Sequence, residues 1–291
     1  MNSVPLASTR ARREMLSTSL QDLPPCFSAP MSGDCSGHRP DIPLRNSFLS
    51  QLRRSTRGPA LAVDVGANDG AWSYWLRTLA NRHAPWHPLN IVMFDPQKRV
   101  AGHLQRLAAA SNVTFLQVAA WTRGTLQQPE VLNFFSTASS KQSSLSFGDG
   151  QGARKIRVAQ AVPAIDLAAW LAREASTHSL LMLKIDVEGT EYQLLPHLLA
   201  RGALCLPTHL IIEWHLNYLP PDRRLAALAL RLSLNSTLRN GCASPPIIVH
   251  EEDWHNNRWK SVPGLTALVA AHNTERQPRE ARPKSVEYPV T

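Results

Sequence analysis

The sequence predicts a doubly wound α/β domain over residues 58–272, in which helices cover both faces of a parallel sheet. Three observations predict this fold. Short apolar runs alternate with longer helical stretches, as in consecutive βαβ units. The first apolar run ends in a glycine-rich turn, and later runs end in acidic side chains. Both features lie where doubly wound folds bind their ligands, at the carboxyl ends of the strands.

The expected elements follow the apolar pattern in order. Strands are expected at residues 61–65, 90–94, 113–118, 180–187, 209–213 and 247–250, and helices at 71–81, 99–110, 165–173, 191–201 and 223–234. Pro196 predicts a kink or a late start in the fourth helix. Residues 121–162 interrupt the alternation with a serine-rich stretch at 136–146 and a strand-like run at 155–158. We expect a loop or a small hairpin there, beside the site and able to cover a ligand.

The two ends of the chain have the composition of disordered segments. Residues 1–57 are expected to form a mostly disordered N-terminal arm and residues 273–291 a disordered C-terminal tail, because their polar, proline-containing sequences bury little apolar surface. Arg10, Arg12 and Arg13, with few acidic residues around them, also resemble a transit peptide. A cytoplasmic location is expected, and a plastid or mitochondrion is the alternative if the N-terminus is a transit peptide.

Composition argues against several function classes. The net charge is +9, but residues 58–272 hold 19 Lys or Arg against 15 Asp or Glu without a basic cluster, so a nucleic-acid groove is not indicated. No apolar stretch reaches the roughly 18 residues of a membrane span. Cys26, Cys35, Cys205 and Cys242 form no CxxC pair, which argues against a zinc site or a disulfide framework and favours a reducing compartment.

The turn from Val63 to Gly70 is the first candidate site. Gly66 permits a tight turn and close approach of a ligand to the backbone, and Gly70 permits close packing of the next helix. Asn68 and Asp69 are suited to cap that helix. The alternative is that these glycines serve only the backbone conformation of a strand-to-helix turn and bind no ligand. The residues expected to bind a cofactor here are Asp64, Gly66, Ala67, Asn68 and Gly70.

The second and third strands indicate what kind of ligand the turn binds. Asp95, at the end of the second strand, can accept hydrogen bonds from the two ribose hydroxyls of a nucleoside. A dinucleotide would favour a GxGxxG turn, and Asp69 would repel its pyrophosphate, so a sulfonium ligand without phosphate fits better. Ala119 and Ala120 after the third strand leave room for adenine, or they are ordinary core residues.

Charged residues near the end of a buried strand form the second candidate site. Lys184, Asp186 and Glu188 alternate in a run that should be apolar on both faces, so we expect them to point to one side beside the turn. Glu213 and His215 follow the next strand with the same spacing. The cluster could orient a substrate hydroxyl, take its proton or hold a divalent cation. An internal ion pair between Lys184 and Glu188 and a structural role for His215 remain alternatives, and the helix N-terminus alone explains Glu191.

Together these motifs resemble the FkbM-type methyltransferases. The resemblance rests on residues 63–70, 94–96, 183–191 and 212–215, and it extends over about residues 61–259. It implies a Rossmann-like, seven-stranded methyltransferase sheet and S-adenosylmethionine as cofactor. It also implies methylation of oxygen on small-molecule or glycan acceptors. Asp95 stands where this family commonly has glutamate, a change that keeps the ribose-binding chemistry with a shorter reach.

The resulting hypothesis is an S-adenosylmethionine-dependent O-methyltransferase that transfers the methyl group in line to an acceptor hydroxyl. Asp186, Glu188, Glu213 and His215 are the expected catalytic residues, with Asp186 near the reacting centre and His215 or Glu213 as base or orienting group. No metal ligands are assigned. The alternatives are a nicotinamide-dependent oxidoreductase and a methyltransferase-like interaction module that lacks catalysis.

Overall fold

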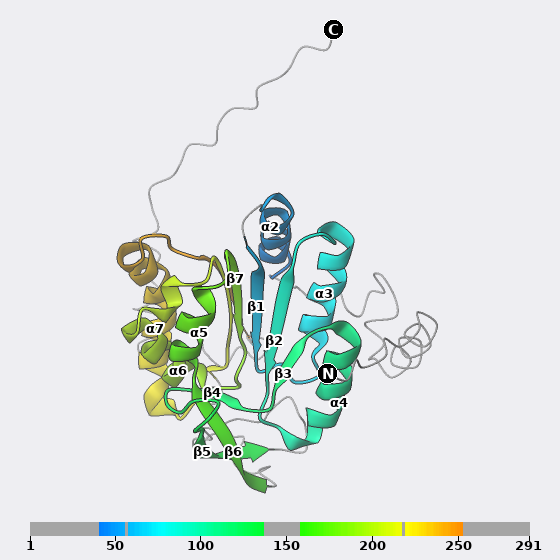
Figure 1. Cartoon of the computed structure of the whole chain (residues 1–291). Coiled ribbons are helices and arrows are strands. Elements are labelled where there is room, and N and C mark those ends of the chain that lie inside the picture. Colours follow the sequence, from blue (N-terminus) through cyan, green and yellow to red (C-terminus); the bar gives the residue numbers. More distant parts are fainter. Residues whose placement is uncertain (1–40, 56–57, 137–157, 217–218, 253–291) are drawn as a thin grey trace, which may run out of the picture.

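The main sheet has six strands in the order β3-β2-β1-β7-β8-β9, and every neighbouring pair is parallel. The computed structural model describes residues 41–55, 58–136, 158–216 and 219–252 (Figure 1). Within these ranges the doubly wound α/β fold is confirmed, whereas the sheet has six strands where the resemblance implied seven. The strands are β1 Ala60–Val65, β2 Leu89–Phe94, β3 Thr114–Leu116, β7 Leu180–Ile185, β8 His209–Trp214 and β9 Ile247–Glu252.

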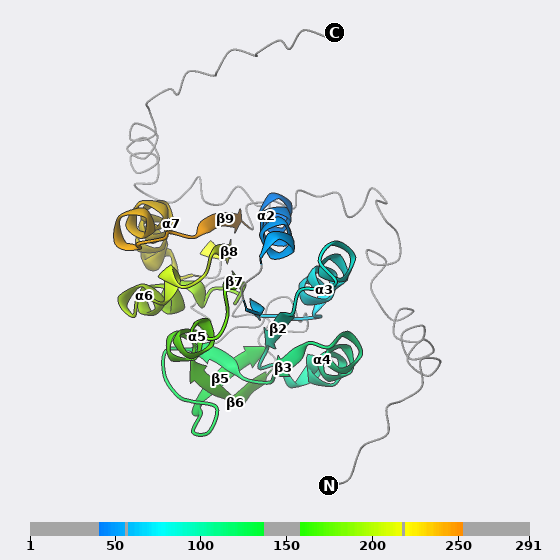
Figure 2. The ribbon, with the colours of Figure 1, turned by 45° about the horizontal axis from the view of Figure 1, so that its top comes forward.

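Helices cover both faces of this sheet (Figures 1 and 2). One face packs against α2 Asp41–Arg54, α3 Ala71–His83 and α4 Lys98–Ser111. The other face packs against α5 Leu167–Ala175, α6 Glu191–Ala200, the short 3-10 helix η5 Ala203–Cys205 and α7 Pro221–Gly241. Alternate residues of each strand enter opposite cores: Ala60 and Ala62 of β1 face the first group, and Leu61, Val63 and Val65 face the second. The central strands β1, β2, β7 and β8 therefore bury apolar side chains on both faces.

Helix α2 shows that part of the N-terminal arm is folded. It lies inside the stretch of residues 1–57 for which disorder was expected, yet Leu44, Phe48, Leu49 and Leu52 are buried in the core. The guanidinium of Arg45 lies 4.6 Å from the ring centre of Trp75 on α3. The folded unit thus begins well before residue 58. Residues 1–40, with the transit-peptide resemblance, and residues 253–291, with the predicted tail, lie outside the described ranges.

The interrupting segment contains a small second sheet with the strand order β4-β6-β5. The strand predicted at 113–118 ends early as β3, and the chain then enters β4 Ala119–Trp121, which pairs with β6 Val158–Asp166. β5 Glu130–Ser136 pairs antiparallel with β6, so the hairpin alternative is confirmed. The rest of the serine-rich stretch and of the run at 155–158, residues 137–157, lies outside the described ranges. Figure 1 shows this sheet at one end of the main sheet.

The structure tests two predicted helix starts. The helix expected from residue 165 begins at Leu167, because the Asp166 side chain accepts hydrogen bonds from the amides of Ala168 and Ala169 and so caps it. The fourth helix begins at Glu191 with Pro196 inside it, so the late start is wrong.

The expectation of no disulfide is also wrong. Cys205 at the end of η5 and Cys242 just after α7 are joined by a disulfide, with Cα atoms 5.3 Å apart. They are 37 residues apart in sequence, and only the return of α7 along η5 brings them together. Cys26 and Cys35 lie outside the described ranges. Among the described residues, no helix is both long enough and apolar enough to span a membrane.

Candidate functional site

A pocket lies at the carboxyl ends of β1, β2 and β7, the edge at which the sequence predicted a ligand. It encloses about 560 Å³, part of which is open to solvent. Its walls come from the glycine turn, the segment after β2, strand β4, the β5 hairpin and the loop after β7. The lining residues are Val65, Gly66, Asn68, Phe94, Asp95, Pro96, Gln97, Val118, Ala119, Ala120, Phe134, Asp186, Val187, Glu188 and Thr190.

The two glycines of the turn are needed because of what surrounds them. Gly66 has a φ of +86°, and a Cβ there would lie 1.7 Å from the carbonyl oxygen of Asp186. Gly70 has a φ of +73°, and its Cβ would lie 2.4 Å from a methyl carbon of Leu107 on α4. Gly70 therefore has the packing role that was predicted. At Gly66 the close approach is to the backbone after β7, so the turn and the charged cluster are in direct contact.

Asp95 stabilises the turn from the neighbouring strand. One carboxylate oxygen accepts a hydrogen bond from the amide of Asn68 at 2.8 Å, and the other accepts one from the amide of Gln97 at 2.9 Å. Burial raises the pKa of Asp95 to about 7, although these two amides oppose the shift. Asp95 lines the pocket and also fixes the conformation of its wall.

Asp64 lies beneath the pocket, which it does not line. Its carboxylate is fully buried, accepts a hydrogen bond from the Ser73 hydroxyl at 2.8 Å and lies 3.7 Å from the Lys184 ammonium. Asp64 and Lys184 are register partners on β1 and β7, which explains this ion pair. Burial raises the pKa of Asp64. Burial also disfavours the Lys184 ammonium, but Asp186 and Asp64 outweigh it and raise the pKa of Lys184 above its usual range.

The far wall of the pocket is small and apolar. Ala119 and Ala120 of β4 line it, together with Phe134 of β5. Ala119 and Phe134 are also buried against each other, so the two interpretations of these alanines, room for a ligand and core packing, both describe them. Phe134 was not anticipated, although the hairpin that holds it was expected to cover a ligand.

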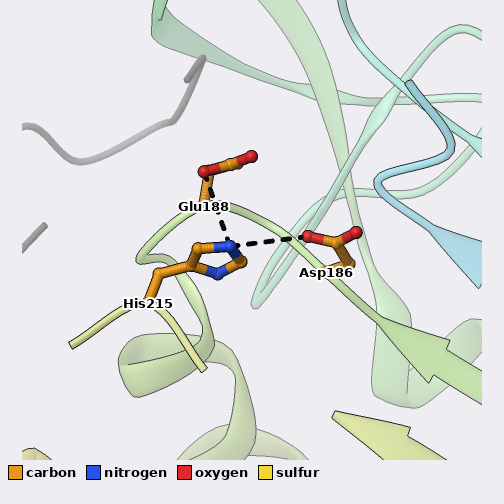
Figure 3. A group of neighbouring side chains, drawn as sticks. All are labelled: Asp186, Glu188 and His215. Atoms are coloured by element: carbon orange, nitrogen blue, oxygen red, sulfur yellow. Dashed lines mark ion pairs between the residues drawn. The ribbon is translucent and has the colours of Figure 1, made fainter. Parts of the chain in front are cut away.

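The charged cluster forms where the loop after β7 meets the end of β8. His215 Nε2 lies 3.5 Å from Glu188 Oε2, 3.7 Å from Glu213 Oε1 and 3.8 Å from Asp186 Oδ1. Figure 3 shows one ring nitrogen of His215 directed at both Asp186 and Glu188. Ligand atoms of Asp186, Glu188 and His215 all lie within 4.8 Å of one another. The four predicted catalytic residues are therefore neighbours, with Asp186 and Glu188 on the pocket wall.

The route by which Glu188 joins the cluster differs from the prediction. β7 ends at Ile185, so strand alternation does not extend to Glu188. Glu188 instead has a φ of +54°, followed by Gly189 at +99°, and this turn returns its side chain toward His215. Lys184 pairs with Asp186 at 2.7 Å, so it does not form the ion pair with Glu188 that was considered as an alternative.

Glu191 is the site residue whose role the sequence did not reveal. It is fully buried, and its carboxylate accepts hydrogen bonds from the amides of Val187 and Gly189 at 2.9 Å each. His215 Nδ1 lies 2.9 Å from the same carboxylate. Since a carboxylate only accepts, Nδ1 carries the hydrogen and Nε2 faces the other three acids. Because an acidic residue is favourable at the start of a helix, nothing in the sequence alone indicated that Glu191 orients His215.

Burial and charge shift the acidities of the cluster in opposite directions. Burial raises the pKa of Glu188 to about 8 and that of Glu213 to about 7. Burial disfavours charge on Asp186 too, but Lys184 and His215 lower its pKa. Burial opposes protonation of His215, yet Glu191 and the other acids raise its pKa to about 10. The cluster holds protons near neutral pH on groups that usually do not carry them.

The pocket includes five of the eight residues predicted to bind a cofactor, namely Gly66, Asn68, Asp95, Ala119 and Ala120. Asp64, Ala67 and Gly70 lie behind the pocket wall. Asp64 pairs with Lys184, whereas Ala67 and Gly70 pack against leucine side chains of α4. Glu213 and His215 likewise adjoin Asp186 without lining the pocket. Gln97 and Thr190 line it and had no signal in the sequence beyond their place next to the predicted residues.

Comparison with known proteins gives one match. A family model described as the methyltransferase FkbM domain matches residues 64–232, which include the glycine turn, the pocket and the charged cluster. No curated protein and no solved structure matches the chain significantly.

Proposed function

Because the chain belongs to the methyltransferase FkbM domain family, we propose that it is an S-adenosylmethionine-dependent enzyme that methylates a hydroxyl oxygen of a small molecule or glycan. One observation carries the proposal: Asp186 belongs to both halves of the site. Its carbonyl oxygen faces Gly66 of the pocket turn, and its carboxylate belongs to the charged cluster. A ligand in the pocket would thus have its reactive end beside the acids.

The lining of the pocket fits this cofactor. Asn68 Oδ1 is buried without a hydrogen-bond partner among the described residues, so it can accept a hydrogen bond from a ligand. Asp95 supplies a carboxylate for ribose hydroxyls, and the alanines of β4 leave space for a flat ring. Among the described residues, the lining includes three carboxyl groups and neither Lys nor Arg, which favours a positively charged ligand over a pyrophosphate.

The protein's own groups would prepare the acceptor hydroxyl. S-adenosylmethionine supplies a methyl group on a positively charged sulfur. Asp186, ionised through its pair with Lys184, would stabilise that charge and orient the acceptor. Glu213 is the best candidate to take the hydroxyl proton, because its pKa of about 7 leaves a substantial fraction ionised at neutral pH. His215, whose pKa is about 10, is a poor base.

Calorimetric titration of the full chain with S-adenosylmethionine, its demethylated product and NAD tests the cofactor. We expect the first two to bind and NAD not to. Binding of NAD but not of S-adenosylmethionine would reverse the assignment in favour of an oxidoreductase. Binding without product over a panel of monosaccharide and polyhydroxylated acceptors would favour a non-catalytic module.

Substitution of Asp186 tests the catalytic part of the proposal. Asp186→Asn should still bind the cofactor, although less tightly, and at saturating cofactor should lower the rate of product formation by at least about 100-fold, since charge at the reacting centre is lost. Asp222→Asn, at an exposed position on α7, is the matched control and should leave the rate unchanged. Unchanged turnover in Asp186→Asn with intact binding would refute the role of this carboxylate.

A further inference from the structure

The distances in the charged cluster are unusual for hydrogen bonds. The three carboxylate oxygens around His215 Nε2 lie at 3.5 to 3.8 Å, whereas an N–H···O bond is typically about 2.7–3.2 Å long. Two donor atoms that bind one small cation tetrahedrally, at about 2.1 Å each, lie about 3.4 Å apart. The distances from His215 Nε2 to Glu188 Oε2 and Asp186 Oδ1, 3.5 and 3.8 Å, are close to such an edge, and the ligand atoms of the three residues all lie within 4.8 Å of one another.

The orientation of His215 supports the same interpretation. Its Nδ1 is held 2.9 Å from Glu191, a carboxylate that is itself fixed by two backbone amides. A carboxylate that accepts the remote N–H of an imidazole is the usual support of a metal-binding histidine. This arrangement directs Nε2 toward Asp186 and Glu188, as Figure 3 shows.

The environment of Glu188 Oε2 is a further observation. Glu188 Oε2 is inaccessible to solvent and has no hydrogen-bond partner among the described residues, although it lies 3.5 Å from His215 Nε2. Buried carboxylate oxygens are normally satisfied, and an unsatisfied one calls for a ligand such as an ion. Asp186 divides its two oxygens: Oδ2 binds Lys184 at 2.7 Å, and Oδ1 faces the histidine.

The charges in this region also leave room for a cation. Among the described residues, five carboxyl groups pair with only two basic groups, Lys184 and His215. The acids are Asp64, Asp186, Glu188, Glu191 and Glu213. Because uncompensated charge is costly in a buried site, carboxyl groups in such excess either hold protons or bind a cation. A divalent cation would displace the protons that the cluster, including His215 Nε2, holds without it.

We propose that Asp186, Glu188 and His215 bind one divalent cation of the first transition row, Zn²⁺ or Mn²⁺, with Glu191 as the positioning residue for His215. The donor set of one imidazole nitrogen and carboxylate oxygens suits these ions better than Mg²⁺ or Ca²⁺, which prefer oxygen alone. The role of the cation rests on the proposed function: at the pocket wall it would bind the acceptor oxygen and lower the pKa of its hydroxyl, leaving Glu213 to take the proton.

The test measures metal binding by the full chain without cofactor or acceptor. The protein is treated with EDTA, dialysed and titrated calorimetrically with ZnCl₂, MnCl₂ and MgCl₂, and Mn²⁺ binding is checked by loss of the free-ion electron paramagnetic resonance signal. We expect one Zn²⁺ or Mn²⁺ per chain and weaker binding of Mg²⁺. Glu188→Gln and His215→Gln should each weaken binding at least tenfold, and Glu191→Gln by about 10- to 100-fold. Glu174→Gln, which changes a surface acid paired with Arg173, should not alter it.

Near-ultraviolet circular dichroism of each variant separates loss of binding from loss of the fold. Folded wild-type protein that binds neither Zn²⁺ nor Mn²⁺ would overturn the proposal, as would equal affinity in folded Glu188→Gln or His215→Gln. These results also distinguish failure of the metal site from failure of the proposed function. A chain that binds the cation but not S-adenosylmethionine contradicts only the methyltransferase assignment, and the reverse result contradicts only the metal site.

Discussion

Replacing Gly66 with alanine tests whether the cofactor turn and the charged cluster are mechanically coupled. The new Cβ would lie 1.7 Å from the Asp186 carbonyl oxygen and 2.8 Å from its carbonyl carbon. Both contacts are with backbone, so no side-chain rotation relieves them. The chain after β1 or the chain after β7 must move by more than 1 Å to bring the Cβ to 3.0 Å from the oxygen, the shortest distance that real Cβ atoms show.

The cost has two parts that a matched variant separates. A non-glycine residue at positive φ costs about 1–2 kcal/mol, and displacement of packed backbone adds about 1–3 kcal/mol. Gly202 has a φ of +67°, and a Cβ added there would meet nothing within 4 Å, so Gly202→Ala carries only the first part. We expect Gly66→Ala to lower the free energy of unfolding by roughly 2–5 kcal/mol and Gly202→Ala by roughly 1–2 kcal/mol.

Urea denaturation of the two variants and the wild type measures this difference, and calorimetry measures S-adenosylmethionine binding in parallel. Gly66→Ala should also weaken binding, because the turn and Asp186 both line the pocket, whereas Gly202→Ala should not. Equal stability losses in the two variants, or unaltered binding in folded Gly66→Ala, would refute the coupling between the turn and Asp186.

Three further predictions concern stability. Burial lowers the pKa of His209 to about 4 from 6.5, so the unfolded chain binds the extra proton in this window; stability should fall by up to roughly 3 kcal/mol as the pH drops from 6.5 to 4, and urea denaturation should show a flatter profile for His209→Gln. Phe48→Ala, at a fully buried position of α2, should cost about 3–5 kcal/mol, whereas Asn46→Ala on the exposed side should cost little; equal effects would contradict integration of α2. Cys205→Ser opens a loop of 37 residues closed by the bond to Cys242, and its thermal midpoint should fall below that of the wild type under oxidising conditions but not under reducing ones.

The fold was predictable where burial is decided locally. The runs of β1 and β8 are apolar on both faces, and their predicted positions differ from the structure by only a residue at one end. The boundary between β3 and β4 was not predictable in this way, because one apolar run is shared by two sheets. Helix α2 did carry a signal: Leu44, Phe48, Leu49 and Leu52 have helical spacing, but a polar, proline-containing neighbourhood concealed it.

The site was predictable as a set of residues and not as a geometry. Anomalous charges near the ends of buried strands identified Asp186, Glu188, Glu213 and His215, because burial leaves charge without solvent. Their arrangement depends on a turn with positive φ at Glu188 and on Glu191, whose carboxylate accepts two amides of the same turn. Spacing along the chain does not encode such a fold-back, so the orientation of His215 required the structure.

The register between β1 and β7 brings the pocket turn and the charged cluster together. Asp64 pairs with Lys184 and Val65 with Ile185, so continuing the register places Gly66 beside Asp186. The pairing of Asp64 with Lys184 therefore holds a buried ion pair beneath the pocket. Two residues further along the same strands, Gly66 of the pocket turn lies against the backbone of Asp186 in the charged cluster. Because Lys184 contacts both Asp64 and Asp186, a change of charge below the pocket also reaches the acids at its wall. We therefore expect ligand binding in the pocket to depend on the protonation of the cluster.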